Sequence, residues 1–185
     1  MYEPYWRLRY RPFRVEGGVE SYVPSPAHDE ALARLNYLVE ANHRVGLLLG
    51  AMGTGKSLLF GIAAQEWRRI GASVVCTSLR AKDSRETLHS IARGWDAAVD
   101  LHAPTFELWH SIADKLAENR WQQVPTLALF DDADRAADDV LDQVMRLAHC
   151  EPTADSRLTV VLAAQGHRRA ATGRHRARLV CRRSM

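Results

Sequence analysis

Short apolar runs alternate along this chain with longer stretches in which apolar residues recur every three or four positions. Four of the short runs, at residues 44–49, 73–77, 126–130 and 158–163, are almost continuous in aliphatic or β-branched residues. We predict a strand for each run, because continuous apolar runs of this length are typical of parallel strands that are buried on both faces of a sheet.

The longer stretches predict helices at residues 26–41, 56–70, 84–94, 106–119 and 138–149. Phe106, Trp109 and Ile112, for example, fall on one face of a helix. Ser25 followed by Pro26 marks the start of the first helix, because serine is a common N-cap and proline suits the first helical turn. Strands that alternate with helices predict an α/β fold, a three-layer α-β-α sandwich with a parallel sheet.

The composition is that of an ordinary globular protein and excludes several other classes. None of the apolar runs approaches the roughly 18 residues that cross a bilayer, and the N-terminus lacks the apolar core of a signal peptide, so a cytoplasmic location is the default expectation. The three cysteines lie far apart, and the eight histidines show no metal-ligand spacing. We therefore expect neither a disulfide framework nor a zinc site.

Positive charge is concentrated near the C-terminal end. The net charge is +3, but residues 166–185 contain seven arginines and no acidic residue, so residues 1–165 carry 18 basic and 22 acidic residues. We divide the chain into an aromatic N-terminal segment at 1–25 that packs on the core, a core at 26–165 and a basic tail at 166–185. The tail is predicted to be disordered, although its arginines could also bind nucleic acid through phosphate contacts.

One glycine-rich segment carries the strongest indication of chemistry. GAMGTGKS, at residues 50–57, fits the phosphate-binding pattern G-x-x-x-x-G-K-[ST], called Walker A, and lies between a predicted strand and a predicted helix. Gly50, Gly53 and Gly55 allow backbone N–H groups to turn inward around an anion, and the helix N-terminus adds further donors. Lys56 is expected at the β- and γ-phosphates and Ser57 at Mg²⁺. The alternative is a glycine-rich turn with a solvated lysine.

Two aspartates follow the third predicted strand. Because Asp131 lies at the carboxyl end of a buried strand, we expect its carboxylate beside the glycine-rich loop, where it would bind Mg²⁺ through water. Asp132 could orient or deprotonate the water that attacks the γ-phosphate. Alternatively, both aspartates cap the loop or the helix that follows.

A third polar residue lies at the end of the fourth predicted strand. Gln165 could hydrogen-bond the γ-phosphate or the attacking water, and it would then detect the loss of the phosphate after hydrolysis. It could equally be an ordinary loop residue. The predicted catalytic residues are thus Lys56, Asp132 and Gln165, and the predicted metal ligands are Ser57 and Asp131.

The order of these motifs resembles that of a known ATPase family. An apolar strand with GAMGTGKS, then LALFDD (Walker B) and LTVVLAAQ, is similar to the AAA+ P-loop ATPases. More narrowly, YEPYWRLRYRPF, SPAHDEALARLNYLVE and the loop resemble the ExeA/GspA-like ATPase domain, which is associated with general secretion and related to TniB-type transposition ATPases. The likeness covers about residues 2–168.

The resemblance implies roles for particular residues. It implies Mg²⁺ and water roles at Asp131 and Asp132, and a γ-phosphate sensor at Gln165. It also places Pro12 and Phe13, in the aromatic N-terminal segment, near the adenine. The implied ATP contacts are Gly53, Thr54, Gly55, Lys56, Ser57 and Leu58.

Two features depart from that family. The family usually has glutamate where this chain has Asp132, which is one methylene shorter, and hydrolysis could be slow because catalysis is sensitive to displacements of about 1 Å. The chain also ends where a fifth core strand, an arginine finger and a C-terminal helical lid would follow in the family.

Three functions are open on the sequence alone. The first is an ATPase that converts the binding and hydrolysis of MgATP into conformational work on a partner, as a homo-oligomer or with another protein. The second is a nucleotide-binding switch or truncated remnant that does not hydrolyse ATP. The third is a DNA-binding ATPase of the transposition type. The absence of an N-K-x-D motif favours adenine over guanine.

Overall fold

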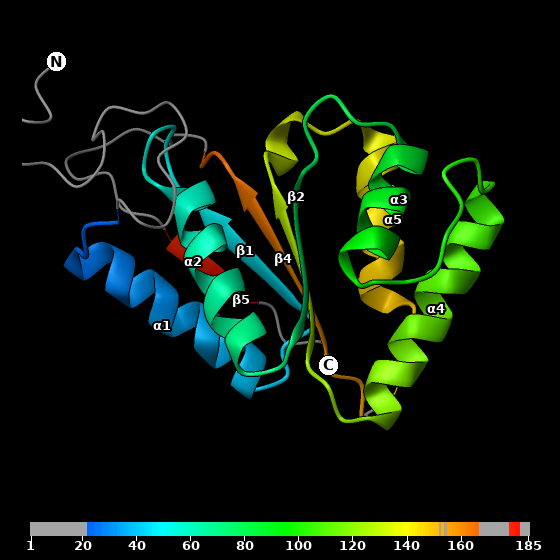
Figure 1. The fold of residues 1–185 in the computed structure, drawn as a ribbon. Coiled ribbons are helices and arrows are strands. Elements are labelled where there is room, and N and C mark those ends of the chain that lie inside the picture. The colour runs from blue at the N-terminus through cyan, green and yellow to red at the C-terminus, as the bar shows by residue number, and fades with distance from the viewer. Residues whose placement is uncertain (1–21, 152, 154, 167–177, 182–185) are drawn as a thin grey trace, which may run out of the picture.

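The computed structural model describes residues 22–151, 153, 155–166 and 178–181. Its helices and strands follow nearly the predicted boundaries (Figure 1). The elements are, in chain order, α1 (Pro26–Glu40), β1 (Val45–Leu49), α2 (Lys56–Arg69), β2 (Ser73–Ser78), α3 (Ser84–Gly94), α4 (Thr105–Trp121), β3 (Thr126–Asp131), the 3-10 helix η2 (Ala133–Arg135), α5 (Asp138–His149), β4 (Leu158–Ala164) and β5 (Arg178–Cys181).

The strands of the described residues form one sheet in the order β2-β3-β4-β1-β5. Strands β1 to β4 are parallel, as predicted, with Ser73 paired with Thr126 between β2 and β3 and Val45 paired with Val160 between β1 and β4. Because these strands are parallel, the loops that follow them leave from the same edge of the sheet. Open α/β sheets bind their ligands at this edge.

Strand β5 lies within the basic tail, where we predicted no strand. It runs antiparallel to β1, with Gly46 opposite Cys181 and Leu49 opposite Arg178, so the sheet is mixed. Without β5, the N–H and C=O groups along one side of β1 would lack a strand partner. The run Leu-Val-Cys at 179–181 is apolar, and we overlooked it because the arginines around it dominate the composition.

Several expectations lie outside the described residues. They concern residues 167–177 and 182–185 of the tail and residues 1–21 of the N-terminal segment, including Pro12 and Phe13.

Helices cover both faces of the sheet and give the three predicted layers (Figure 1). α1 and α2 pack on one face, where Leu127 and Leu129 of β3 lie in one buried cluster with Leu35 of α1. α3, α4 and α5 cover the other face, where Ala128 and Phe130 of β3 lie in a second cluster. Alternate residues of β3 therefore point to opposite faces, and burial on both faces explains the continuous apolar run.

The N-termini of two helices are fixed by side-chain caps. The Ser25 hydroxyl accepts a hydrogen bond from the N–H of His28, which confirms the predicted start of α1. Asp83 and Glu86 form a reciprocal capping box at α3. These caps set the positions of the loops that enter both helices.

The free edge of the sheet at β2 is partly covered. Arg68 of α2 donates a hydrogen bond from Nη2 to the carbonyl oxygen of Val74 at 2.8 Å. This carbonyl group has therefore found a partner other than a neighbouring strand.

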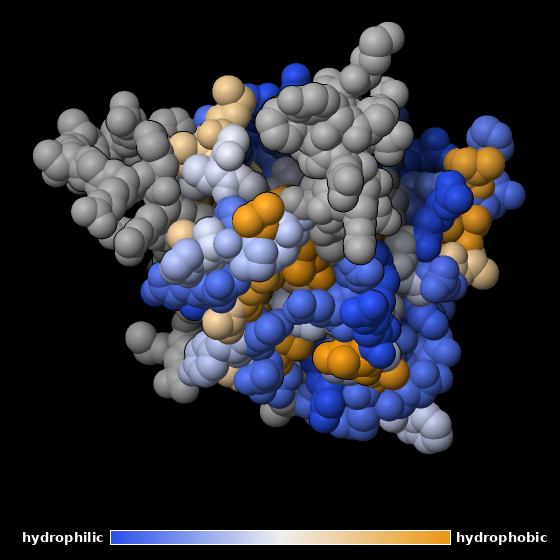
Figure 2. All heavy atoms as spheres, turned by 60° about the vertical axis from the view of Figure 1, so that its left-hand side comes forward, coloured by the Kyte–Doolittle hydropathy of each residue, from blue (hydrophilic) through white to orange (hydrophobic). Residues whose placement is uncertain are grey.

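On the face shown in Figure 2, hydrophobic residues form small areas separated by hydrophilic residues. Among the described helices, we find none that combines the length and the apolar character needed to cross a membrane.

Candidate functional site

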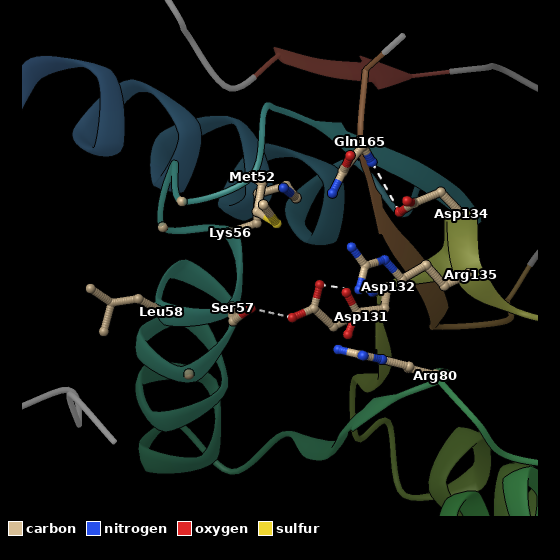
Figure 3. Close-up of a pocket in the computed structure, with 13 residues that line it drawn as sticks. Met52, Lys56, Ser57, Leu58, Arg80, Asp131, Asp132, Asp134, Arg135 and Gln165 are labelled. Atoms are coloured by element: carbon tan, nitrogen blue, oxygen red, sulfur yellow. Dashed lines mark hydrogen bonds between the residues drawn. The ribbon is translucent and has the colours of Figure 1, made fainter. Parts of the chain in front are cut away.

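A cavity of about 620 Å³ opens at the carboxyl ends of the parallel strands (Figure 3). It lies between the loop after β1 and the segments that follow β2, β3 and β4. Its lining is Met52, Gly53, Gly55, Lys56, Ser57, Leu58, Gly61, Arg80, Asp131, Asp132, Asp134, Arg135 and Gln165. The structure thus brings together most of the residues that the motifs singled out.

The glycine-rich loop presents free backbone donors at the start of α2. Gly53 and Gly55 adopt left-handed conformations, with φ of 77° and 82°, which favour glycine. Several N–H groups of the loop and the first helical turn have no hydrogen-bond acceptor among the described residues, and those of Gly53, Gly55, Lys56, Ser57 and Leu58 are among them. Unpaired N–H groups at a helix N-terminus form a binding site for an anion.

Lys56 lies folded across this loop. Its ammonium group donates hydrogen bonds to the carbonyl oxygens of Gly50 at 2.9 Å and Ala51 at 3.0 Å. An ammonium group has three donors, so one is left for a ligand in the cavity.

Three residues that we expected to contact the nucleotide are not placed at the cavity in the way that we expected. Gly50 and Thr54 do not line the cavity, although they shape the loop. The Gly50 N–H donates to the Ala164 carbonyl at 3.3 Å, and the Thr54 hydroxyl donates to the Ala51 carbonyl at 2.9 Å. Leu58 lines the cavity, but Figure 3 shows its side chain directed away from Asp131.

Asp131 connects the end of β3 to the loop. Its Oδ2 accepts a hydrogen bond from the Ser57 hydroxyl, and its Oδ1 accepts one from the N–H of Asp132 at 2.8 Å (Figure 3). A hydroxyl group and a carboxylate are oxygen ligands of the kind that Mg²⁺ prefers.

Among the described residues, no group of three or more histidine, cysteine, aspartate or glutamate side chains could hold a metal ion. Mg²⁺ usually takes one or two protein ligands and completes its coordination shell with phosphates and water.

Asp132 is held by a residue that sequence reasoning missed. Its backbone is left-handed, with φ of 55°, which aspartate tolerates better than most residues. Its Oδ2 accepts a hydrogen bond from the Ser78 hydroxyl at 3.0 Å, and Ser78 Oγ accepts one from the Arg80 N–H at 3.1 Å. Ser78 is the last residue of β2. Its position as a polar residue directly after the predicted strand at 73–77 could have identified it as a candidate for the site.

Gln165 lies at the cavity as expected, next to a second missed residue. Its backbone N–H donates to Asp134 Oδ1 at 3.0 Å (Figure 3). This bond ties η2 to the end of β4. Asp134 belongs to the acidic run after β3, in which the sequence drew attention only to Asp131 and Asp132.

Two arginines complete the lining and were also missed. Arg80 follows β2 and Arg135 ends η2. Figure 3 shows both guanidinium groups on the side of the cavity where Asp131 and Asp132 lie. Within the described residues, neither guanidinium takes part in an ion pair or a hydrogen bond. Two positively charged side chains therefore line the cavity.

Two side chains with shifted pKa values lie outside this cavity. Burial lowers the pKa of Lys82, whose ammonium group donates to Ser90 Oγ at 2.8 Å. Burial, helped by the charge of Glu151, raises the pKa of the Cys150 thiol to about 11, so this thiol is protonated near neutral pH and is a poor nucleophile.

Comparisons with known proteins agree with this fold. No protein-family model matches the chain. The chain is 29% identical over 167 residues to general secretion pathway protein A of Aeromonas hydrophila. The aligned region covers 89% of this chain and 30% of that protein.

Two solved structures share the architecture. Cdc6p of Pyrobaculum aerophilum superposes with a TM-score of 0.60 and 21% identity, over 79% of this chain and 41% of that one. The ORC2 protein of Aeropyrum pernix, solved as ADPNP-ADP complexes, superposes with a TM-score of 0.53 and 19% sequence identity. This match covers 79% of this chain and 44% of that one. Both likenesses confirm the predicted α/β P-loop fold. The chain spans less than half the length of each of these three proteins.

Proposed function

We propose that this chain, which has the P-loop fold of the AAA+ ATPases and resembles general secretion pathway protein A, binds MgATP in the cavity and hydrolyses it. The observation that carries the proposal is the contact between Ser57 and Asp131. It joins, at the ligand-binding edge of the sheet, the two motifs from which the sequence predicted a MgATP site.

Binding would use the phosphate loop. The N–H groups of Gly53 and Gly55 would donate to phosphate oxygens, and the free donor of Lys56 would contact the β- or γ-phosphate. Ser57 and Asp131 would hold Mg²⁺, which neutralises phosphate charge when it is bound. The ADPNP and ADP in the A. pernix ORC2 structure support adenine as the base. Contacts of the nucleotide with Gly50, Thr54 and Leu58 stay predictions.

Hydrolysis needs a group that orients the attacking water and accepts its proton. We assign Asp132 this role, because it lines the cavity beside Asp131 and uses one carboxylate oxygen for Ser78. Gln165, at the same cavity, would hydrogen-bond the γ-phosphate or the water. Arg80 and Arg135, which line the cavity, would supply positive charge for the transition state.

A nucleotide-binding switch without hydrolysis is the second candidate. The hydrogen bond from Ser78 to Asp132 favours it, because it occupies one of the two carboxylate oxygens that could accept the proton of the attacking water. Asp132 is also one methylene shorter than the glutamate of related ATPases. In this case MgATP would stabilise the fold without turnover.

We also propose the kind of process in which this chain acts. The likeness to general secretion pathway protein A supports conformational work on a protein partner or on further copies of this chain, in the cytoplasm. DNA binding by the arginines of the tail is the alternative.

Phosphate release and nucleotide binding separate the two candidates. The purified chain and its Lys56→Ala variant are compared for phosphate release with MgATP and for thermal stabilisation by MgATP, which reaches about 2.7 kcal/mol at a ligand concentration of 100 Kd. Release above the variant supports the ATPase, and stabilisation without release supports the switch. Equal stabilisation of both proteins would contradict both candidates.

A further inference from the structure

His28 contacts the phosphate loop from outside the cavity. It lies in the first turn of α1, and its Nε2 is 3.2 Å from the carbonyl oxygen of Thr54. The ring also packs against Gly55, because a Cβ atom at that glycine would lie 3.0 Å from the same Nε2. No motif drew attention to this histidine, and it does not line the cavity.

The partner of Nε2 determines where the proton of the ring lies. A carbonyl oxygen can only accept, so Nε2 must donate and therefore carries the proton. Nδ1 is buried and has no hydrogen-bond partner among the described residues. The hydrogen bond to the phosphate loop is thus the polar contact that this ring makes in the described part of the chain.

This hydrogen bond fixes the orientation of one peptide group of the loop. In a planar trans peptide, the C=O of one residue and the N–H of the next point in opposite directions. Because His28 draws the Thr54 carbonyl outward toward α1, the N–H of Gly55 is directed away from α1. That N–H has no acceptor among the described residues, and Gly55 lines the cavity.

The imidazole is itself held in place by its neighbours. The backbone N–H of His28 donates a hydrogen bond to Ser25 Oγ at 3.3 Å, which fixes the backbone that carries the ring. The ring of Tyr22 lies with its centroid 5.8 Å from that of His28, and the Tyr22 hydroxyl donates to Asp29 Oδ1 at 3.4 Å. A side chain fixed in this way can hold the loop ready before a ligand arrives.

We propose that His28 is a positioning residue for phosphate binding, which holds the peptide group between Thr54 and Gly55 so that the Gly55 N–H can donate to a nucleotide phosphate. The inference rests on the proposed function, since it concerns the same cavity. It assigns the start of α1 a part in nucleotide affinity. ATP and ADP should be affected alike, because the peptide group belongs to the loop as a whole and not to the γ-phosphate.

Two substitutions at this position separate the hydrogen bond from the packing of the ring. His28→Leu retains an apolar side chain and removes the donor, whereas His28→Gln places an amide N–H₂ group at a reach similar to that of Nε2. Dissociation constants for MgATP and MgADP are measured by calorimetry on the full chain. We expect about a tenfold increase for His28→Leu with both nucleotides and less than about threefold for His28→Gln, as for the loss and retention of one hydrogen bond.

Several outcomes would overturn the proposal. One is wild-type affinity in His28→Leu under conditions where Lys56→Ala no longer binds, and another is an equal loss in His28→Gln and His28→Leu. Failure of the wild-type chain to bind MgATP would instead contradict the proposed function. If His28→Leu does not fold, ¹⁵N spectra of the wild-type histidines decide the matter, since a ring protonated at Nδ1 and not at Nε2 excludes the hydrogen bond.

Discussion

The hydroxyl of Ser57 donates a hydrogen bond to Asp131 Oδ2, across a separation of 74 residues in the sequence. The bond places the first turn of α2 against the carboxyl end of β3. Both groups are also the proposed ligands of Mg²⁺, so the ion would replace a contact that already holds the two halves of the site together.

Asp131→Asn should therefore weaken the effect of magnesium more than it weakens nucleotide binding itself. An amide keeps the shape of the side chain and can still contact Ser57, but it loses the negative charge that attracts the ion. We expect the gain in ATP affinity on adding Mg²⁺ to fall about tenfold, which corresponds to about 1.4 kcal/mol.

Calorimetry with Mg²⁺ and with EDTA measures this difference. Asp142→Asn is the matched control, because Asp142 is exposed on α5 and makes the same change of charge away from the cavity. A reduced magnesium effect in both variants would indicate a general effect of charge and not a ligand.

Asp132→Asn should separate binding from hydrolysis. Asparagine tolerates the left-handed backbone at this position, so the fold and the loop should be preserved. The amide cannot accept the proton of the attacking water. We expect phosphate release to fall at least about a hundredfold, the lower end of general-base contributions, while the dissociation constant for MgATP stays within about threefold. Unchanged release in this variant would exclude Asp132 as the base.

Ser78→Ala should have the opposite effect on turnover. Removal of the hydroxyl frees Asp132 Oδ2 from its hydrogen bond, so that this oxygen can also accept from the attacking water. An increase in phosphate release of about fivefold, with unchanged affinity, would correspond to one hydrogen bond of about 1 kcal/mol. A decrease would mean that Ser78 holds Asp132 in its productive position.

Arg80 and Arg135 should contribute to the distinction between ATP and ADP. Both line the cavity near Asp131 and Asp132 and carry charge without a partner among the described residues. Replacement of each by glutamine should reduce the preference for ATP by about three- to tenfold, as expected for one charged contact. Arg93→Gln, on an exposed position of α3, is the control and should leave the ratio of the two dissociation constants unchanged.

Gly94→Ala should destabilise the protein although alanine favours helices. A Cβ at this position, the last of α3, would lie 2.4 Å from Cγ2 and 2.7 Å from Cβ of Val75, so helix and sheet would have to move apart. We expect a loss of about 1–3 kcal/mol in the free energy of unfolding, measured with urea. Arg93→Ala, at the neighbouring exposed position, should change it by less than about 0.5 kcal/mol.

The parallel strands and half of the site could be predicted because their signals are local. In β3, continuous burial produces a continuous apolar run, and Asp131 and Asp132 follow that run directly. The loop motif is local in the same way, since strand, glycines and helix are consecutive. Parallel order then brings the strand ends to one edge, which is why Ser57 and Asp131 could be predicted to lie close together.

The other residues of the site depend on which elements become neighbours. Ser78 reaches Asp132 only because β2 pairs with β3, and no pattern indicates a contact across 54 residues. His28 meets Thr54 because α1 packs beside the loop. β5 was missed for another reason, since an apolar run this short is hidden by the arginines that surround it.

The bond from Arg68 to the Val74 carbonyl has a consequence for the behaviour of the protein at high concentration. An unpaired strand edge is a template on which another chain can add a strand, and such additions lead to aggregation. Here the acceptor is occupied, and a positive charge lies beside it. A second molecule would have to displace that arginine before its own backbone could pair with the Val74 carbonyl group, so a single side chain of α2 hinders the addition of a strand at this point of β2.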